Sequence, residues 1–130
     1  MVKEIDSTTL QSRMAAGDDV HLIDIRTPGE IAGGVIPDAA LLPMQLIPSR
    51  VEELPRDREV VLYCRSGARS YHACAYLMEQ GFDNVVNLRG GIRLVPVDNS
   101  LIFISFVSRL RAKRTDSLTN RFFLLSIRPV

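Results

Sequence analysis

The stretch Glu59-Val-Val-Leu-Tyr63-Cys64-Arg-Ser-Gly-Ala-Arg69-Ser70 decides the fold of this 130-residue chain. Its first five residues, Glu59 followed by the apolar run 60–63, are typical of a buried parallel strand. A loop that contains Gly67 follows, and residues 70–80 are helical in pattern and end before Gly81. A strand, a short loop and a helix in this order predict a βα unit. Its loop lies at the carboxyl edge of the sheet, where open α/β sheets bind ligands.

Strands and helices alternate on both sides of this unit. Ser7 is expected to cap a helix that runs to Ala16 and stops at Gly17. The sequence Thr27-Pro-Gly-Glu30 has the form of a capping box with proline at the first helical position. Further strands are predicted at residues 2–5, 20–24, 39–42 and 85–88, and a helical segment broken at Pro48 at residues 44–54. The predicted fold class is α/β, a small and mainly parallel sheet with helices on both faces.

Composition excludes several classes of protein. A hydrophobic content of 46% and a charged content of 24% are ordinary for a globular chain and exclude a wholly disordered one. A net charge of +1 gives no overall attraction to nucleic acid or to anionic membranes. No apolar run approaches the ~20 residues of a membrane-spanning helix, and no signal peptide is expected. We therefore expect a cytoplasmic protein with no nucleic-acid partner, and these features do not favour a membrane partner.

The charge is divided unevenly along the chain. Residues 1–92 carry nine Lys and Arg against 13 Asp and Glu, a net charge of −4, whereas residues 93–130 carry seven against two, a net charge of +5. We therefore divide the chain into a domain over 1–92 and a basic, apolar tail over 93–130. The tail has three open interpretations, which are a shifted reading frame, a docking extension and a membrane-surface segment. If the tail covers apolar surface of the domain, part of residues 94–107 is expected to pack on it.

The loop after Tyr63 has the features of an anion-binding site. A tight turn from strand to helix leaves successive backbone N–H groups unpaired and forms a concave nest, and the helix N-terminus adds about half a positive charge. Arg65 and Arg69 add formal charge, or Arg69 clamps the loop. Such a site favours a thiolate on Cys64 and lowers its pKa from ~8.5. A thiolate of this kind is a nucleophile toward an anionic substrate. The alternative is a structural cysteine beside surface arginines.

Several motifs in the same order resemble the single-domain rhodaneses, a family of sulfurtransferases. They are Leu22-Ile-Asp24-Ile-Arg26 with Thr27-Pro28-Gly-Glu30, then Gly34-Val-Ile-Pro37-Asp-Ala39, then Cys64-Arg-Ser-Gly-Ala-Arg69-Ser70, then Gly81-Phe-Asp-Asn-Val-Val-Asn-Leu-Arg-Gly90-Gly-Ile92. The resemblance implies ping-pong transfer in which Cys64 takes the outer sulfur of thiosulfate or a related anionic donor. The persulfide then passes its sulfur to a thiol or cyanide-like acceptor, or to a protein. No cofactor is implied.

The resemblance also implies roles for the residues around Cys64. The backbone amides that would hold the persulfide are those of Arg65, Ser66, Gly67, Ala68 and Arg69. The residues expected to support the site are Asp24, Arg26, Glu30 and Ser70. The loop from Cys64 to Arg69 has six residues, whereas related phosphatases and arsenate reductases have one more, so its length favours sulfur. A non-catalytic docking module and, with less support, a phosphatase or arsenate reductase remain as alternatives.

Two features depart from the rhodanese pattern. Val35 stands where the family often has a histidine, which removes a polar side chain near the loop. Beyond Ile92 the family usually continues into a closing helix with a tryptophan, and this chain contains no tryptophan. Cys74 is expected to pack in the core from one face of its helix. The two histidines lack the partners expected of a metal ligand or a catalytic base. No metal site is expected, because two cysteines without paired spacing do not form one.

Overall fold

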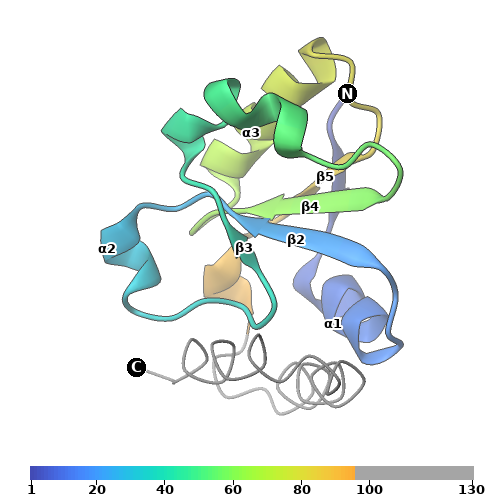
Figure 1. Cartoon of the computed structure of the whole chain (residues 1–130). Coiled ribbons are helices and arrows are strands. Elements are labelled where there is room, and N and C mark those ends of the chain that lie inside the picture. The colour runs from blue at the N-terminus through green and yellow to red at the C-terminus, as the bar shows by residue number, and fades with distance from the viewer. Residues whose placement is uncertain (96–130) are drawn as a thin grey trace, which may run out of the picture.

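Five short segments pair into one sheet whose strands all run parallel (Figure 1). They are β1 (Lys3–Ile5), β2 (Val20–Asp24), β3 (Ala40–Leu41), β4 (Glu59–Tyr63) and β5 (Val85–Leu88), in the order β1-β5-β4-β2-β3. The computed structural model describes residues 1–95. Because β4 is the central strand, the residue that follows it, Cys64, lies at the middle of the carboxyl edge of the sheet.

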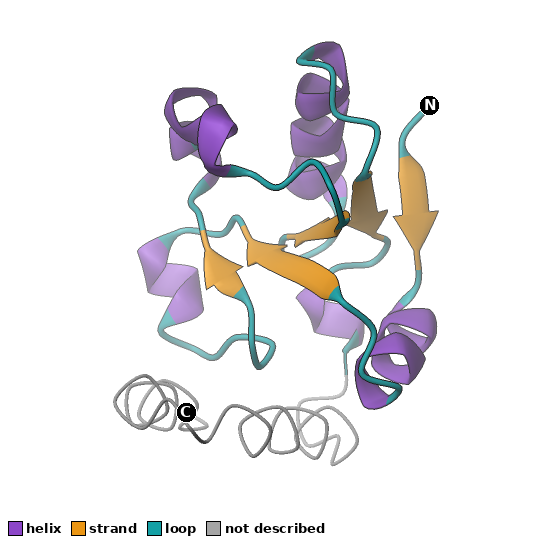
Figure 2. Ribbon diagram, turned by 45° about the vertical axis from the view of Figure 1, so that its right-hand side comes forward, coloured by secondary structure: helices purple, strands orange, loops and turns teal. Residues whose placement is uncertain are grey.

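Helices cover both faces of the sheet (Figure 2). The elements are α1 (Ser7–Ala15), α2 (Pro28–Ile31) and α3 (Ala68–Glu79), with the 3-10 helices η1 (Met44–Leu46), η2 (Pro48–Glu53) and η3 (Ile92–Leu94). Val60 and Leu62 of β4 pack in the cluster that contains α3 residues, and Val61 and Tyr63 pack in the cluster that contains α1 residues. Successive residues of a strand point to opposite faces. The predicted α/β class, with helices on both faces, is confirmed.

The helix starts differ from the sequence prediction at two places. Asp6, not Ser7, is the N-cap of α1, because its side chain accepts the Thr9 amide at 2.8 Å. The helix α3 starts at Ala68, two residues before Ser70. Its N-cap is Gly67, which has a left-handed backbone conformation with a φ of 98°. Glycine has no side chain that could form a capping hydrogen bond, so only the glycine marks this helix start in the sequence.

The shorter elements agree more closely with the sequence. Thr27 and Glu30 form the predicted capping box, and Pro28 occupies the first helical position of α2. The predicted helical segment at 44–54 consists of the two 3-10 helices η1 and η2, and the break between them comes just before Pro48. Cys74 is fully buried in the cluster under α3, as predicted.

The described part of the chain continues three residues past the predicted boundary at Ile92. Val95 is buried in the cluster on the α1 side of the sheet, whereas Leu94 is 57% exposed. The packing prediction for residues 96–107, and every prediction for the rest of the tail to residue 130, lies outside the described residues. No helix among residues 1–95 is long and apolar enough to cross a bilayer.

Candidate active site

The loop between β4 and α3 is shaped by two amides that follow the glycine pair Gly90-Gly91. The Ile92 amide donates to the Cys64 carbonyl at 3.0 Å, and the Arg93 amide donates to the Arg65 carbonyl at 3.2 Å. These bonds occupy the first two carbonyl groups of the loop. Within residues 1–95, the amides of Ala68 and Arg69 have no protein acceptor, as is usual in the first turn of a helix. The loop therefore offers free N–H donors, as the nest prediction requires.

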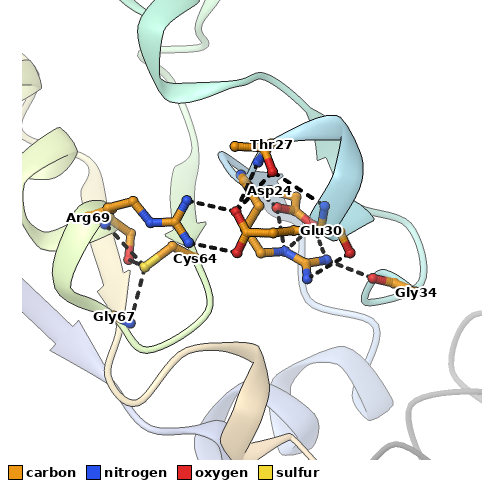
Figure 3. Close-up of polar contacts among 9 residues, drawn as sticks. Asp24, Thr27, Glu30, Gly34, Cys64, Gly67 and Arg69 are labelled. Atoms are coloured by element: carbon orange, nitrogen blue, oxygen red, sulfur yellow. Dashed lines mark hydrogen bonds and ion pairs between the residues drawn. The ribbon is translucent and has the colours of Figure 1, made fainter. Parts of the chain in front are cut away.

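Three donors surround the sulfur of Cys64 (Figure 3). The Gly67 amide lies 3.1 Å from Sγ, the Ser70 amide 3.4 Å and the Ser70 hydroxyl 3.3 Å. Cys64 is fully buried, and this burial alone would raise its pKa. The hydrogen bonds from Ser70, Gly67 and Ser66 outweigh the burial, and the pKa of Cys64 lies below its usual value. This geometry favours the thiolate more than the surroundings of an ordinary cysteine do.

Arg69 clamps the loop to a neighbouring helix. Its Nη1 and Nη2 atoms donate to Oε1 and Oε2 of Glu30 at 2.9 and 2.8 Å, a two-point ion pair that joins α3 to α2 (Figure 3). Arg69 thus makes the clamp that the sequence offers as one of its two roles, and its charge also interacts with Cys64. The hydrogen bonds from Arg69 lower the pKa of Glu30 to about 2, and partial burial opposes them.

A second ion pair holds the chain beyond β2. Arg26 and Asp24 are both buried, with Nη2 of Arg26 2.8 Å from Oδ2 of Asp24. The same Nη2 atom donates to the Gly34 carbonyl at 2.7 Å, and Nη1 donates to the Glu30 carbonyl at 3.4 Å (Figure 3). Arg26 therefore ties the end of β2 to α2 and to the segment that carries Val35. Together with the Glu30–Arg69 pair, it links this segment to the loop of Cys64.

The structure also shows a polar contact that the sequence does not predict. The Ser70 hydroxyl donates to Oδ1 of Asn87, which is buried in β5. The only signal in the sequence is a polar residue between Val86 and Leu88, inside a strand that is otherwise apolar. Among residues 1–95, no group of three His, Cys, Asp or Glu side chains could hold a metal ion.

The Glu30–Arg69 clamp leads to a prediction about pH. Because the pKa of Glu30 is about 2 in the folded chain and 4.5 as the reference, the pair stabilises the fold above pH ~4.5. That contribution is lost as the pH falls toward 2. Both side chains are partly exposed, so we expect Glu30→Gln to lower the free energy of unfolding by only about 1 kcal/mol at pH 7. Urea unfolding at pH 7 and at pH 3 measures this difference, which should shrink at the lower pH.

The Arg50–Glu53 pair supplies the control for this prediction. It is more exposed, with side chains 43% and 60% accessible, and it belongs to η2. We expect Glu53→Gln to change the stability less than Glu30→Gln does at pH 7. A pH-independent difference between Glu30→Gln and the wild type would contradict the assignment of the low pKa to Glu30.

Comparisons with known proteins point to one family. The rhodanese-like domain family matches residues 6–95. A sulfurtransferase of Allochromatium vinosum is 67% identical over 92 residues, which cover 71% of this chain and 86% of that protein. The putative sulfurtransferase YtwF of Bacillus subtilis is 44% identical over 91 residues, covering 70% and 87%. A crystal structure of a rhodanese-like domain protein from Staphylococcus aureus superposes with a TM-score of 0.66 at 33% identity, covering 70% and 88%. This chain therefore belongs to the rhodanese-like domain family.

Proposed function

We propose that this chain is a sulfurtransferase that carries a sulfane sulfur on Cys64 as a persulfide. The observation that carries the proposal is the set of three hydrogen-bond donors around Sγ, at the end of the central strand. These donors favour the thiolate, the form that attacks sulfur. The two relatives described above, both named as sulfurtransferases, support the same activity.

The first half of the reaction balances without a cofactor. The Cys64 thiolate attacks the outer sulfur of thiosulfate, a new S–S bond forms, and the S–S bond of thiosulfate breaks. Sulfite leaves with the electron pair of the broken bond, and the negative charge moves to the outer sulfur of the persulfide. A thiol, a cyanide-like nucleophile or a protein thiolate then attacks that outer sulfur, and the Cys64 thiolate leaves. In this reaction the free amides of the loop, including those of Ala68 and Arg69, are proposed to hold the outer sulfur.

The size of the site favours sulfur over a tetrahedral oxyanion. Cys64 has no exposed surface, so a donor must present a narrow terminal atom to reach it. The loop from Cys64 to Arg69 has only six residues, and Ile92 and Arg93 bond its first two carbonyl groups from behind. A terminal sulfur meets this requirement better than a phosphoryl or arsenate group.

Arg65 is proposed to attract the anionic donor. It is exposed and directly follows Cys64 in the loop. We expect Arg65→Ala to slow loading by thiosulfate about threefold to tenfold at low salt, and the difference should diminish as the salt concentration rises. The matched control is Arg58→Ala, which removes an exposed arginine from the opposite end of β4. Equal slowing in both variants would contradict a local role for Arg65.

Incubation with thiosulfate followed by intact-mass measurement tests the proposed function. The chain should gain the mass of one sulfur atom, and should lose it again when cyanide is added. A non-catalytic docking module would gain no mass at any donor concentration. If the chain failed to load from thiosulfate, and also from mercaptopyruvate and from a persulfidated protein, the proposal would be wrong.

A further inference from the structure

Asn87 is a buried polar residue whose side chain is fully engaged. It is 1% exposed and lies in β5, opposite Glu4 of β1 in the strand register. Its Nδ2 atom donates to Oε2 of Glu4 at 2.8 Å and to the Gly67 carbonyl at 3.2 Å. Its Oδ1 atom lies 2.5 Å from the Ser70 hydroxyl oxygen. The residue therefore connects the edge strand to the Cys64 loop.

These partners determine which way the amide of Asn87 faces. If the amide were turned over, its oxygen would face the Glu4 carboxylate and the Gly67 carbonyl, which are both acceptors. With the amide as it stands, both Nδ2 protons have acceptors and Oδ1 faces Ser70. Toward the Ser70 hydroxyl, Asn87 therefore acts as a hydrogen-bond acceptor and not as a donor.

The Ser70 hydroxyl has one proton and two acceptors. It lies 3.3 Å from Sγ of Cys64 and 2.5 Å from Oδ1 of Asn87. A hydroxyl donates one hydrogen bond at a time, so the two acceptors compete for it. An anionic acceptor is stronger than a neutral one. When Cys64 is a thiolate, the Ser70 hydroxyl therefore donates its hydrogen bond to Sγ instead of to Asn87. A neutral thiol does not take this hydrogen bond from Asn87, and neither does the inner sulfur of a persulfide, because the charge has moved to the outer sulfur.

We propose that Asn87 is a positioning residue that accepts the Ser70 hydroxyl whenever the inner sulfur of Cys64 carries no charge. The inference rests on the proposed persulfide chemistry, because it assigns the bond to Ser70 differently in the free and loaded forms. In the free thiolate, Ser70 donates to Sγ and stabilises the nucleophile. In the loaded form, Ser70 turns to Asn87, so the buried hydroxyl keeps a partner and the persulfide is stabilised relative to the thiolate.

Charged groups around the site must stay constant for this competition to be measured. Arg69 of α3 is the cation that interacts electrostatically with Cys64, and Asp24 and Glu30 in turn act on Arg69. Glu4 of β1 lies on the far side of Asn87. Substitutions at Ser70 and Asn87 remove none of these four charged side chains. A change in the Cys64 titration then reports on hydrogen bonding.

A double-mutant cycle on Ser70 and Asn87 tests the proposal. The rate of alkylation by iodoacetamide against pH gives the pKa of Cys64 in the wild type, Asn87→Ala, Ser70→Ala and the double variant. Asn87→Ala removes the partner that the Ser70 hydroxyl has in the thiol form but not in the thiolate form. It should therefore destabilise the thiol and lower the pKa of Cys64, with the thiolate-to-thiol ratio rising about threefold. In the Ser70→Ala background the same substitution should have no effect. If Asn87 only supported the fold, its substitution would change the pKa of Cys64 in the Ser70→Ala background as well.

The loading equilibrium with thiosulfate and sulfite provides a second measurement. Asn87→Ala should shift it about threefold toward the unloaded thiolate, again only when Ser70 is present. Asn87→Leu keeps the number and branching of the side-chain heavy atoms. It should reproduce both shifts and is the second variant if Asn87→Ala does not fold. The matched control is Asn84→Ala, which removes a side chain that bonds the Pro55 and Arg58 carbonyls just before β5. It should lower thermal stability without changing the pKa of Cys64.

The outcomes separate this inference from the proposed function. A raised or unchanged pKa of Cys64 in Asn87→Ala and Asn87→Leu would overturn the inference, as would an equal shift in both Ser70 backgrounds. Either result leaves sulfur loading by the wild type intact. A wild type that accepts no sulfur from any donor overturns the proposed function instead, and the alkylation measurement needs no donor at all.

Discussion

Replacement of Cys64 by serine is expected to abolish the mass gain from thiosulfate, whereas Cys74→Ser is expected to load like the wild type. Both cysteines are free and fully buried, so exposure does not distinguish them. The difference lies in their donors. Three donors, the Gly67 and Ser70 amides and the Ser70 hydroxyl, lie within hydrogen-bond distance of the sulfur of Cys64. Burial instead raises the pKa of Cys74 to about 12, with a smaller contribution from the charge of Glu4. Cys74 therefore stays a neutral thiol at neutral pH.

The two variants are controls for each other. Each replaces a sulfur by an oxygen in a buried position, and circular dichroism checks that both variants keep the fold. Intact-mass measurement after incubation with thiosulfate, with and without added cyanide, gives the result for each chain. A loaded Cys64→Ser variant, or a Cys74→Ser variant that fails to load, would show that the nucleophile has been assigned wrongly.

The local part of the site could be read from the sequence because its signals are close together in the chain. The apolar run 60–63, the cysteine after it and the glycine at position 67 lie within nine residues. Each reports on backbone conformation or burial through its own residue type. The capping box at Thr27 is equally local, and it also occurs where predicted. The start of α3 was placed two residues too late because Gly67 caps the helix with its backbone and has no side chain to mark it.

The partners of the loop could not be predicted in the same way, because they come from distant positions. Glu30 is 39 residues from Arg69, and Asn87 is 17 residues from Ser70. Their proximity depends on the strand order, which brings β5 and β2 to either side of β4. From the sequence, Glu30 is expected to support the site only because the chain resembles the rhodaneses. The contact between Asn87 and Ser70 could be found only in the structure, because a polar residue in a strand does not indicate which side chain it contacts.

The glycine pair behind the loop shows how closely the backbone is packed at this site. Gly91 has a φ of 65° and a ψ of −165°, a region of backbone conformation that is essentially confined to glycine. A Cβ atom at this position would lie 2.4 Å from the Arg65 carbonyl oxygen and 2.6 Å from the Cys64 carbonyl oxygen. Both contacts are with backbone, so no side-chain rotation relieves them. Either the loop or the segment that holds it must move.

Gly91→Ala is therefore expected to damage both the fold and the loop. Strain of about 1–3 kcal/mol from the backbone conformation alone corresponds to a fall in Tm of roughly 5–20 °C for a domain of this size. Displacement of the loop should also break the bonds of Ile92 and Arg93 to its carbonyl groups, so sulfur loading should be lost even at temperatures where the variant is folded. Circular dichroism and intact-mass measurement test the two effects.

The control is Gly29→Ala in α2, where an added Cβ has no atom within 4 Å. This substitution should leave Tm and loading nearly unchanged. A Gly91→Ala variant with the Tm and loading of the wild type would mean that the glycine pair does not shape the Cys64 loop.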